Sequence, residues 1–295
     1  MHLLPEGACM SHTTLVIEGE NGLTIIDPGL DIKGSKEGAG SSVSRVFELS
    51  ESLGKPVQTL IITHSHMDHI FNTRHYLKRF PDLVCIGHAN GPYLNKLLKN
   101  GVSVSVIACD VKRTVDGIDY AFIPTPGHSK AGDDLSVFIP FMKIVHVGDL
   151  FQPQGRTYET ADSISPIPYF HEGNNYLTSL DMLLNLDFDF VVTGHGDVLN
   201  GMSGKRGLEL TKQVLQRIKD LALKLTMENS KVEDEVICDW IYDTIVYERK
   251  FDKIQSSWRK GQGNRSAALY KRFDLPGIQY FVNLAKRTGN GVNSK

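Results

Sequence analysis

The stretch THSHMDH at residues 63–69 directly follows VQTLIIT, an apolar run at residues 57–63 that is rich in β-branched side chains. Such a run predicts a buried strand, and the histidine-rich stretch would leave its end as a loop. The chain has 11 histidines among 295 residues, so three of them at set places beside an aspartate are not expected by chance. Imidazole and carboxylate groups are common metal ligands. The stretch therefore predicts a metal-binding loop.

The spacing within this loop suits two ions rather than one. On a loop that leaves a strand, His64 and His66 can turn their imidazoles toward one ion while Asp68 and His69 face a second. Zinc tolerates irregular coordination by such nitrogen and oxygen ligands and has no redox chemistry of its own. We therefore expect two zinc ions per chain, with iron or manganese as alternatives.

Three further pieces carry single ligand-type residues after apolar runs, namely TPGHS at 125–129, VGDL at 147–150 and TGHG at 193–196. Each one alone is more often a surface or core residue than a ligand, but together with the loop they complete a set of seven. We expect Asp149 to bridge the two ions and the other six residues to divide evenly between them. The first ion would take His64, His66 and His128, and the second Asp68, His69 and His195. An open position left for water indicates catalysis rather than a structural site.

The remaining sequence predicts a layered α/β protein. Strand-like runs recur in two sets, from residue 13 to 109 and from 120 to 194, and amphipathic helical patterns lie between them. This arrangement favours two sheets packed face to face with helices outside. After about residue 203 the apolar residues follow helical spacing, so we expect a catalytic domain at 1–203 and a helical extension at 204–295. The hydrophobic content of 41% and the net charge of -2 are those of an ordinary globular chain.

At this point the chain resembles the metallo-β-lactamase superfamily, whose HxHxDH motif and later His, Asp and His are matched over roughly residues 10–200. The resemblance implies an αβ/βα four-layer sandwich with the metals at one edge of the paired sheets, followed here by the helical extension. Asp27, in the sequence IDPG, matches the first motif of the superfamily, which implies a role behind the metal ligands. In one departure, Ile70-Phe71-Asn72 replaces the glycines that often follow the motif.

The resemblance also implies a hydrolase. Two zinc ions sharing a water would produce a metal-bridging hydroxide that attacks the substrate. Asp68, besides binding metal, is expected to orient this hydroxide and to pass its proton to the leaving group. Such a centre would cleave an ester, a thioester or a lactone.

Details of the sequence narrow this prediction. True β-lactamases have a cysteine where this chain has Asp149, and the gaps of 59, 21 and 46 residues that follow His69 are similar to those of acyl-homoserine lactonases. However, the lactonase tyrosine three residues past the bridging aspartate is Gln152 here. The long segment at residues 151–175 has little apolar periodicity and is expected to wall the substrate pocket. Its candidate substrate contacts are Arg156, Tyr158, Tyr169 and His171.

Three other functions remain open. The fold also serves phosphodiesterases and nucleases, for which the excess of basic residues near the C-terminus is the added support. It also serves iron-dependent redox enzymes, although relatives that reduce oxygen replace the second histidine of the loop with glutamate, whereas His66 is retained here. The third alternative is a ligand-binding effector whose turnover is incidental.

The expected partner is a small-molecule substrate. No membrane contact is expected, and a nucleic acid is disfavoured as a partner. The C-terminal helices would complete the substrate pocket or form the contact of a homodimer. The N-terminal residues lack a basic region followed by an apolar stretch, and no run approaches the length of a membrane span. We therefore expect a cytoplasmic protein.

Overall fold

The computed structural model describes residues 2–5, 13–30, 42–150, 167–195, 198–248 and 270–292. These fall into two compact units. The first unit comprises Met1–Phe151 and Asn185–Lys205, and the second comprises Gln152–Leu184 and Arg206–Lys295. All seven predicted metal ligands belong to the first unit.

The first sheet has six strands in chain order. They are β1 (His2–Pro5), β2 (Thr13–Glu18), β3 (Leu23–Ile26), β4 (Val57–Ile62), β5 (Val84–His88) and β6 (Val104–Ile107). The strands β1 to β3 pair antiparallel, and β3 to β6 pair parallel. Strands buried on both faces read as continuous apolar runs, which is why β4 is unmistakable in the sequence.

The second sheet is also mixed and has the order β12-β11-β10-β9-β8-β7. Its strands are β7 (Val111–Val115), β8 (Ile118–Pro124), β9 (Leu135–Ile139), β10 (Ile144–His146), β11 (Phe190–Val192) and β12 (Val198–Asn200). The central pair β10 and β11 is parallel, so the ends of these two strands reach the same edge of the sheet. The other pairs are antiparallel.

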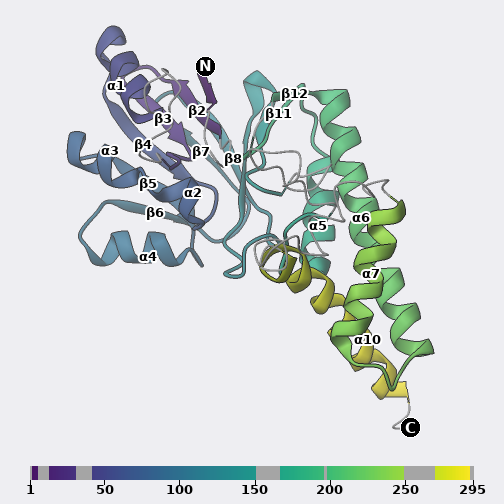
Figure 1. Cartoon of the computed structure of the whole chain (residues 1–295). Helices are drawn as coiled ribbons and strands as arrows, with labels where there is room; N and C mark the ends of the chain where they lie inside the picture. Colours follow the sequence, from purple (N-terminus) through teal and green to yellow (C-terminus); the bar gives the residue numbers. More distant parts are fainter. Residues whose placement is uncertain are drawn as a thin grey trace. The chain divides into compact units, whose positions relative to one another are not determined.

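Four helices of the first unit lie along one side of the first sheet, and the second sheet lies on its other side (Figure 1). They are α1 (Ser42–Leu53), α2 (Met67–Ile70), α3 (Thr73–Arg79) and α4 (Pro92–Lys99). Residues Val43 and Val46 of α1 are spaced by three and both buried, which is the apolar stripe of a surface helix. A 3₁₀ turn, η1 (Pro140–Met142), joins β9 to β10.

The alternation of side chains along the strands produces two cores. Leu15 and Ile17 of β2 pack between the two sheets with residues such as Phe122. Val16, which points to the opposite face, packs with Val46 beneath the helices. The first sheet is thus buried on both faces, and this fixes its register because a slip of one residue would exchange the two cores.

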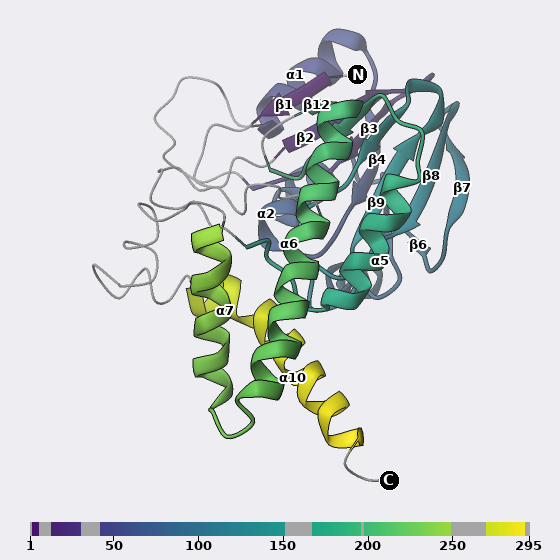
Figure 2. The ribbon, with the colours of Figure 1, turned by 90° about the vertical axis from the view of Figure 1, so that its right-hand side faces the viewer.

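The second unit is helical in its described parts. It contains α5 (Gly173–Leu184), most of α6 (Gly201–Glu228), α7 (Asp234–Glu248), a π-helical turn η3 (Tyr270–Asp274) and α10 (Leu275–Val292). Figure 2 shows α6 and α7 as neighbouring helices joined by a short connection. The guanidinium of Arg217 on α6 donates to Glu248 on α7 at 2.6 Å, and Lys286 on α10 pairs with Asp234 on α7. These ion pairs link α7 to α6 and to α10 at the surface.

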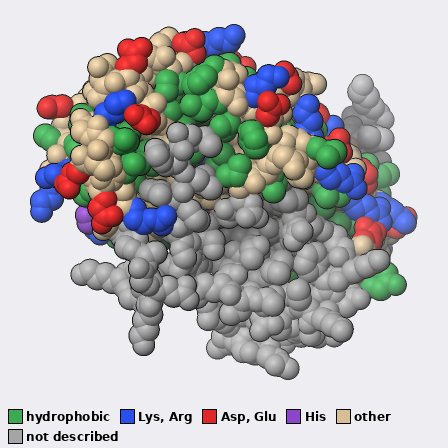
Figure 3. All heavy atoms as spheres, turned by 90° about the horizontal axis from the view of Figure 1, so that it is seen from above, with side chains coloured by type: hydrophobic (Ala, Val, Ile, Leu, Met, Phe, Trp, Pro, Cys, Tyr) green, Lys and Arg blue, Asp and Glu red, His purple; other side chains and the backbone are tan. Residues whose placement is uncertain are grey.

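The structure confirms the predicted α/β sandwich with a C-terminal helical region. The division of the chain after residue 203 stays a prediction. Within the described parts of the chain, every helix is too short or too polar to cross a lipid bilayer. On the face seen in Figure 3, acidic and basic side chains lie among one another over the described surface.

Candidate metal centre

The seven predicted ligands follow the ends of strands in both sheets. His64 and His66 come after β4, and Asp68 and His69 lie in α2, the short helix that follows. The other three lie after β8, β10 and β11, and they are His128, Asp149 and His195. The fold thus brings together residues that are up to 131 positions apart. They form two adjacent groups in which the ligand-type atoms of each group lie within 4.8 Å of one another.

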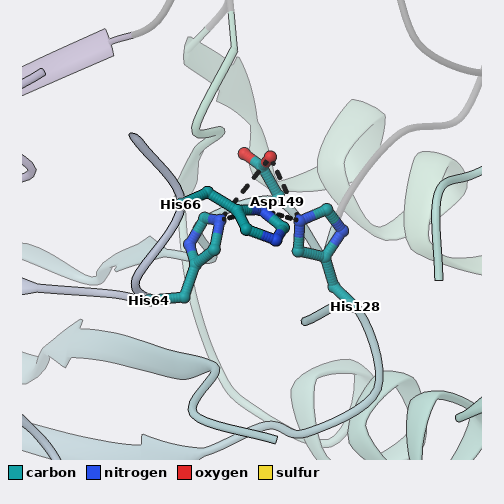
Figure 4. Close-up of side chains that lie close together, drawn as sticks. All are labelled: His64, His66, His128 and Asp149. Carbon is teal, nitrogen blue, oxygen red and sulfur yellow. Dashed lines mark hydrogen bonds and ion pairs between the residues drawn. The ribbon is translucent and has the colours of Figure 1, made fainter. Parts of the chain in front are cut away.

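The first group contains three histidines and Asp149 (Figure 4). Nδ1 of His66 lies 2.9 Å from Nε2 of His64 and 3.1 Å from Nε2 of His128. Nitrogen atoms that bind one zinc ion at about 2.0–2.1 Å lie roughly 3.3 Å apart in a tetrahedral arrangement. The observed spacing of the three nitrogens therefore fits a shared metal ion.

The second group contains Asp68, His69 and His195. Nε2 of His195 lies 3.3 Å from Oδ2 of Asp68. Asp149 reaches this group as well as the first, because its Oδ1 lies 3.2 Å from Nε2 of His69 and its Oδ2 lies 3.2 Å from Nε2 of His195. The same Oδ2 is 3.3 Å from Nε2 of His128. Asp149 thus lies between the groups, where a bridging ligand would lie.

Buried polar atoms test whether a metal fits this arrangement. Among the described residues, the two carboxylate oxygens of Asp149 and Nε2 of His69 are buried without a hydrogen-bond partner. Such atoms are costly to leave unsatisfied in a protein interior. Because they face other ligand-type atoms at metal-binding spacing, a pair of metal ions fits the donor set.

The electrostatics of the centre favour metal-binding protonation states at three ligands but not at His69. Burial acts to lower the pKa of His69, but the charges of Asp149 and Asp27 outweigh it and raise that pKa well above 6.5, so a metal ion has to displace a proton from this ring. Burial, followed by the neighbouring His69 and His66, lowers the pKa of His64 well below 6.5, which keeps this ring neutral. Burial acts to raise the pKa of Asp149, but His195 and His69 outweigh it and hold that pKa well below 3.8. Burial likewise opposes ionisation of Asp68, and the hydrogen bond with His195 and the charge of His69 lower its pKa. Neutral imidazoles and ionised carboxylates are the forms that bind metal.

Asp27 sets the orientation of one histidine in each group. Its Oδ2 accepts hydrogen bonds from Nδ1 of His69 at 2.8 Å and from the hydroxyl of Thr63 at 2.7 Å. Because the Thr63 proton is used on Asp27, the same hydroxyl oxygen accepts from Nδ1 of His64 at 3.0 Å. Both rings therefore carry a proton on Nδ1, which leaves Nε2 as the atom that can bind a metal ion, as in metal-bound histidines. The role behind the metal ligands that the resemblance implies for Asp27 stays a prediction.

Two glycines let the backbone come close to Asp149. Gly148 has a φ of +53°, a conformation that side chains rarely adopt. A Cβ at Gly194 would lie 2.3 Å from Oδ1 of Asp149, so this position has no room for any side chain. The two segments are joined by a hydrogen bond from the Gly194 amide to the Gly148 carbonyl at 2.7 Å. The small residues in VGDL and TGHG are thus part of the site.

At Ile70-Phe71-Asn72, where the family often has glycines, hydrogen bonds of Asn72 stabilise the turn. The side-chain amide of Asn72 donates to the carbonyl of Pro28 at 3.1 Å, and the Asn72 backbone amide donates to the carbonyl of Gly29 at 2.9 Å. The Gly29 amide in turn donates to the carbonyl of His69 at 3.1 Å. Asn72, which is fully buried, therefore attaches the turn after Asp27 to the metal-binding loop.

The predicted substrate contacts are only partly described. Arg156 and Tyr158 lie outside the described residues. Tyr169 and His171 belong to the second unit, where the Tyr169 hydroxyl lies 2.6 Å from Nε2 of His171. The ring of Tyr169 also packs edge-on against Phe273. Their role in binding a substrate stays a prediction.

Sequence reasoning missed three buried polar residues near the ligands. In the sequence, Thr63 marks only the end of a strand, and Asp133 belongs to no recognisable motif, although it lies in the loop that carries His128. The third is His146 in β10, which is fully buried and whose Nδ1 accepts a hydrogen bond from the Gly148 amide at 3.2 Å. A histidine within an otherwise apolar strand was the available signal.

The burial of His146 predicts that the metal-free protein loses stability in acid. Burial is the main cause that lowers its pKa from 6.5 to about 4, and the charge of Asp27 only partly opposes it. Since the unfolded chain binds this proton more readily, the stabilising contribution is complete above pH 6.5 and is lost as the pH falls toward 4. The shift corresponds to about 3 kcal/mol. In urea titrations of the metal-free protein, His146→Asn should flatten the fall of stability between pH 6.5 and 4, and an unchanged slope would contradict the assignment.

Comparisons with known proteins agree with the fold described above. A family model described as "Metallo-beta-lactamase superfamily" matches residues 7–195. No curated protein sequence matches the chain. Among solved structures, the fold is similar to that of a metallo-beta-lactamase from Pontibacter korlensis, with 18% identity, a TM-score of 0.53, and coverage of 73% of this chain and 93% of that one.

Two other solved structures have similar folds. ETHE1 from Myxococcus xanthus is 19% identical with a TM-score of 0.53, and the match covers 74% of this chain and 91% of that chain. A mutant flavo di-iron protein from Thermotoga maritima is 15% identical with a TM-score of 0.53, covering 74% of this chain and 61% of that one. At these identities the likeness shows the fold alone.

Proposed function

The chain belongs to the metallo-β-lactamase superfamily, and on that basis we propose that it is a zinc-dependent hydrolase of an ester, a thioester or a lactone. The observation that carries the proposal is the position of Asp149. This buried carboxylate lies within 3.3 Å of ring nitrogens from both ligand groups, and its oxygens have no hydrogen-bond partner among the described residues. A dinuclear centre explains both facts.

Seven residues would hold the two ions. His64, His66 and His128 would bind the first, Asp68, His69 and His195 the second, and Asp149 both. Two zinc ions, when bound, lower the pKa of a shared water toward neutrality and polarise the oxygen of a carbonyl or phosphoryl group.

The protein's own residues would supply orientation and proton transfer. Asp27 and Thr63 keep a proton on Nδ1 of His69 and His64, so that Nε2 of each ring is the atom available to a metal ion. Asp68 is ionised because His195 and His69 lower its pKa, so its carboxylate is able to accept a proton from the attacking water. It would then deliver that proton to the leaving oxygen or sulfur of an acyl substrate.

Two features of the sequence bear on the substrate, of which the first argues against a β-lactam and the second favours an acyl group. Aspartate at position 149, where true β-lactamases have cysteine, is typical of thioesterases, lactonases and phosphodiesterases of this superfamily. The spacing from His69 to His195 is similar to that of lactonases, as noted above. The basic residues that would favour a phosphodiester are mostly outside the described residues.

The proposal predicts turnover that depends on His66. The zinc-loaded protein would be followed by proton release in weak buffer with thioester, lactone, aryl ester, phosphodiester and alkyl sulfate substrates. We expect hydrolysis of one or more acyl substrates and a loss of more than about a thousandfold in His66→Ala, because a catalytic metal supplies several kcal/mol of transition-state stabilisation. Metal content of each sample would be measured by mass spectrometry.

The matched control is His75→Ala. This exposed histidine lies in α3, six positions after His69, and it should keep full activity. Preference for the phosphodiester would replace the acyl proposal with a nuclease. Iron bound in place of zinc, with oxygen consumption, would replace it with a redox enzyme. Two bound zinc ions without turnover of any substrate would favour a binding role.

A further inference from the structure

One buried carboxylate joins the two loops that carry the first ligand group. Asp133 is only 2% exposed. Its Oδ2 accepts a hydrogen bond from the hydroxyl of Ser65 at 2.5 Å, and its Oδ1 accepts one from the hydroxyl of Ser129 at 2.6 Å. Ser65 lies between His64 and His66, and Ser129 directly follows His128. Asp133 therefore connects both segments that supply nitrogen atoms to the first group.

The His128 loop is also closed on itself. The Asp133 amide donates to the Ser129 hydroxyl oxygen at 3.1 Å. The carboxylate of the next residue, Asp134, accepts from the backbone amides of Gly127 at 3.1 Å and Ser129 at 2.9 Å, which flank His128. Asp134 thus fixes the loop internally, whereas the bond from Asp133 to Ser65 ties the loop to the HxH segment.

The other side of this connection is anchored as well. The Ser65 hydroxyl oxygen accepts from the backbone amide of Tyr93, at the start of α4, at 3.4 Å. A Cβ at Gly91 would lie 3.5 Å from Oδ2 of Asp133, so the carboxylate packs directly against the turn before α4. Asp133 therefore sits between the two ligand loops and a helix of the first unit.

We propose that Asp133 is a positioning residue for the first metal ion, because it sets the separation of His66 and His128 through Ser65 and Ser129. This inference rests on the proposed dinuclear centre. Hydrogen bonds to a carboxylate are shorter and stronger than those between neutral groups, so these two reinforce the backbone bond that also joins the segments, from the Leu135 amide to the Thr63 carbonyl at 2.8 Å. Asp133 acts mainly on the first ion, since the residues next to its two hydrogen bonds, at Ser65 and Ser129, are His64, His66 and His128.

The test is a titration of the metal-free protein with Co²⁺, whose visible absorption reports the geometry of each site. The wild-type chain should bind two equivalents. We expect Asp133→Ala to weaken one equivalent by about 10- to 100-fold and to leave the other unchanged, as is usual when a residue supporting a ligand is lost. His66→Ala and His195→Ala supply reference spectra for loss of the first and the second site. The spectrum of Asp133→Ala should match that of His66→Ala.

Two further variants keep the test decisive. Ser65→Ala removes the bond between the loops but leaves the closed His128 loop intact, so it should weaken the same equivalent even if Asp133→Ala folds poorly. Asp119→Asn changes an exposed carboxylate that accepts a hydrogen bond from Thr114 at 2.6 Å, and it should behave as wild type. Equal weakening of both equivalents, or no weakening in folded Ser65→Ala, overturns the positioning role. Binding of fewer than two ions by the wild-type chain overturns the dinuclear centre itself.

Discussion

Replacing Asp149 with asparagine is expected to weaken the binding of both metal ions together and to reduce turnover by more than about a thousandfold. The carboxylate lies 3.2 Å from His69 and His195 and 3.3 Å from His128, so it contacts both groups. Asparagine has nearly the same shape but removes the negative charge and presents an N–H₂ group, which cannot bind a cation. With the bridge lost, the mutual repulsion of the two ions is no longer offset.

Metal content and activity of Asp149→Asn would be measured on the same samples. The control is Asp187→Asn, the same chemical change at a carboxylate that is 83% exposed and pairs with Lys143. It should retain two ions and full turnover. Retention of two tightly bound ions by Asp149→Asn would contradict the bridging role, and loss of a single ion with the other unaffected would assign Asp149 to one site alone.

The ligand-type residues were predictable because each follows an apolar run. A buried strand can be recognised from its apolar composition, and the residues just past its end lie at the edge of a sheet. The pieces that carry His128, Asp149 and His195 could therefore be placed near the loop after β4 before any coordinates were known. The structure brings them into two adjacent groups, while their binding of metal stays a prediction.

Three of the four edge strands, β1, β7 and β12, could not be predicted in the same way. β7 has the sequence VKRTV, in which partly buried and exposed positions alternate and Lys112 faces outward. Such a strand is defined by its pairing with β8 rather than by its own composition. β1 and β12 are also edge strands, of four and three residues, and short segments carry too little periodicity to be recognised.

The supporting residues were hidden for a different reason. Thr63 and Ser65 are common residue types whose importance comes from partners 36 and 68 positions away, Asp27 and Asp133. No local pattern encodes such a pair. The resemblance to a family pointed to Asp27, but only the hydrogen bonds of Asp133 with both loops in the structure identify Asp133.

Loss of Asp27 should affect stability and metal binding through separate atoms. The carboxylate is fully buried and accepts from the Thr63 amide at 2.9 Å, as well as from the Thr63 hydroxyl and His69. Removing one partner of a buried charged pair costs about 3–5 kcal/mol. Asp27 also has a φ of +54°, where alanine is strained but asparagine is tolerated. In urea titrations of the metal-free protein, Asp27→Ala should lose about 3–5 kcal/mol and Asp27→Asn less.

Asp27→Asn should nevertheless lose metal affinity, by about 10- to 100-fold. Its side-chain amide would donate toward Nδ1 of His69, which must then accept, so the ring proton moves to Nε2, the atom that faces Asp149 at 3.2 Å. A protonated Nε2 cannot bind metal. Thr63→Val distinguishes the effects on the two ligand groups. It removes the hydroxyl that orients His64 but keeps the hydrogen bond that His69 donates to Asp27. In chelator competition, Thr63→Val should weaken the first ion, whereas Asp27→Asn should weaken both. Equal affinities in Asp27→Asn and wild type would show that the tautomers are set elsewhere.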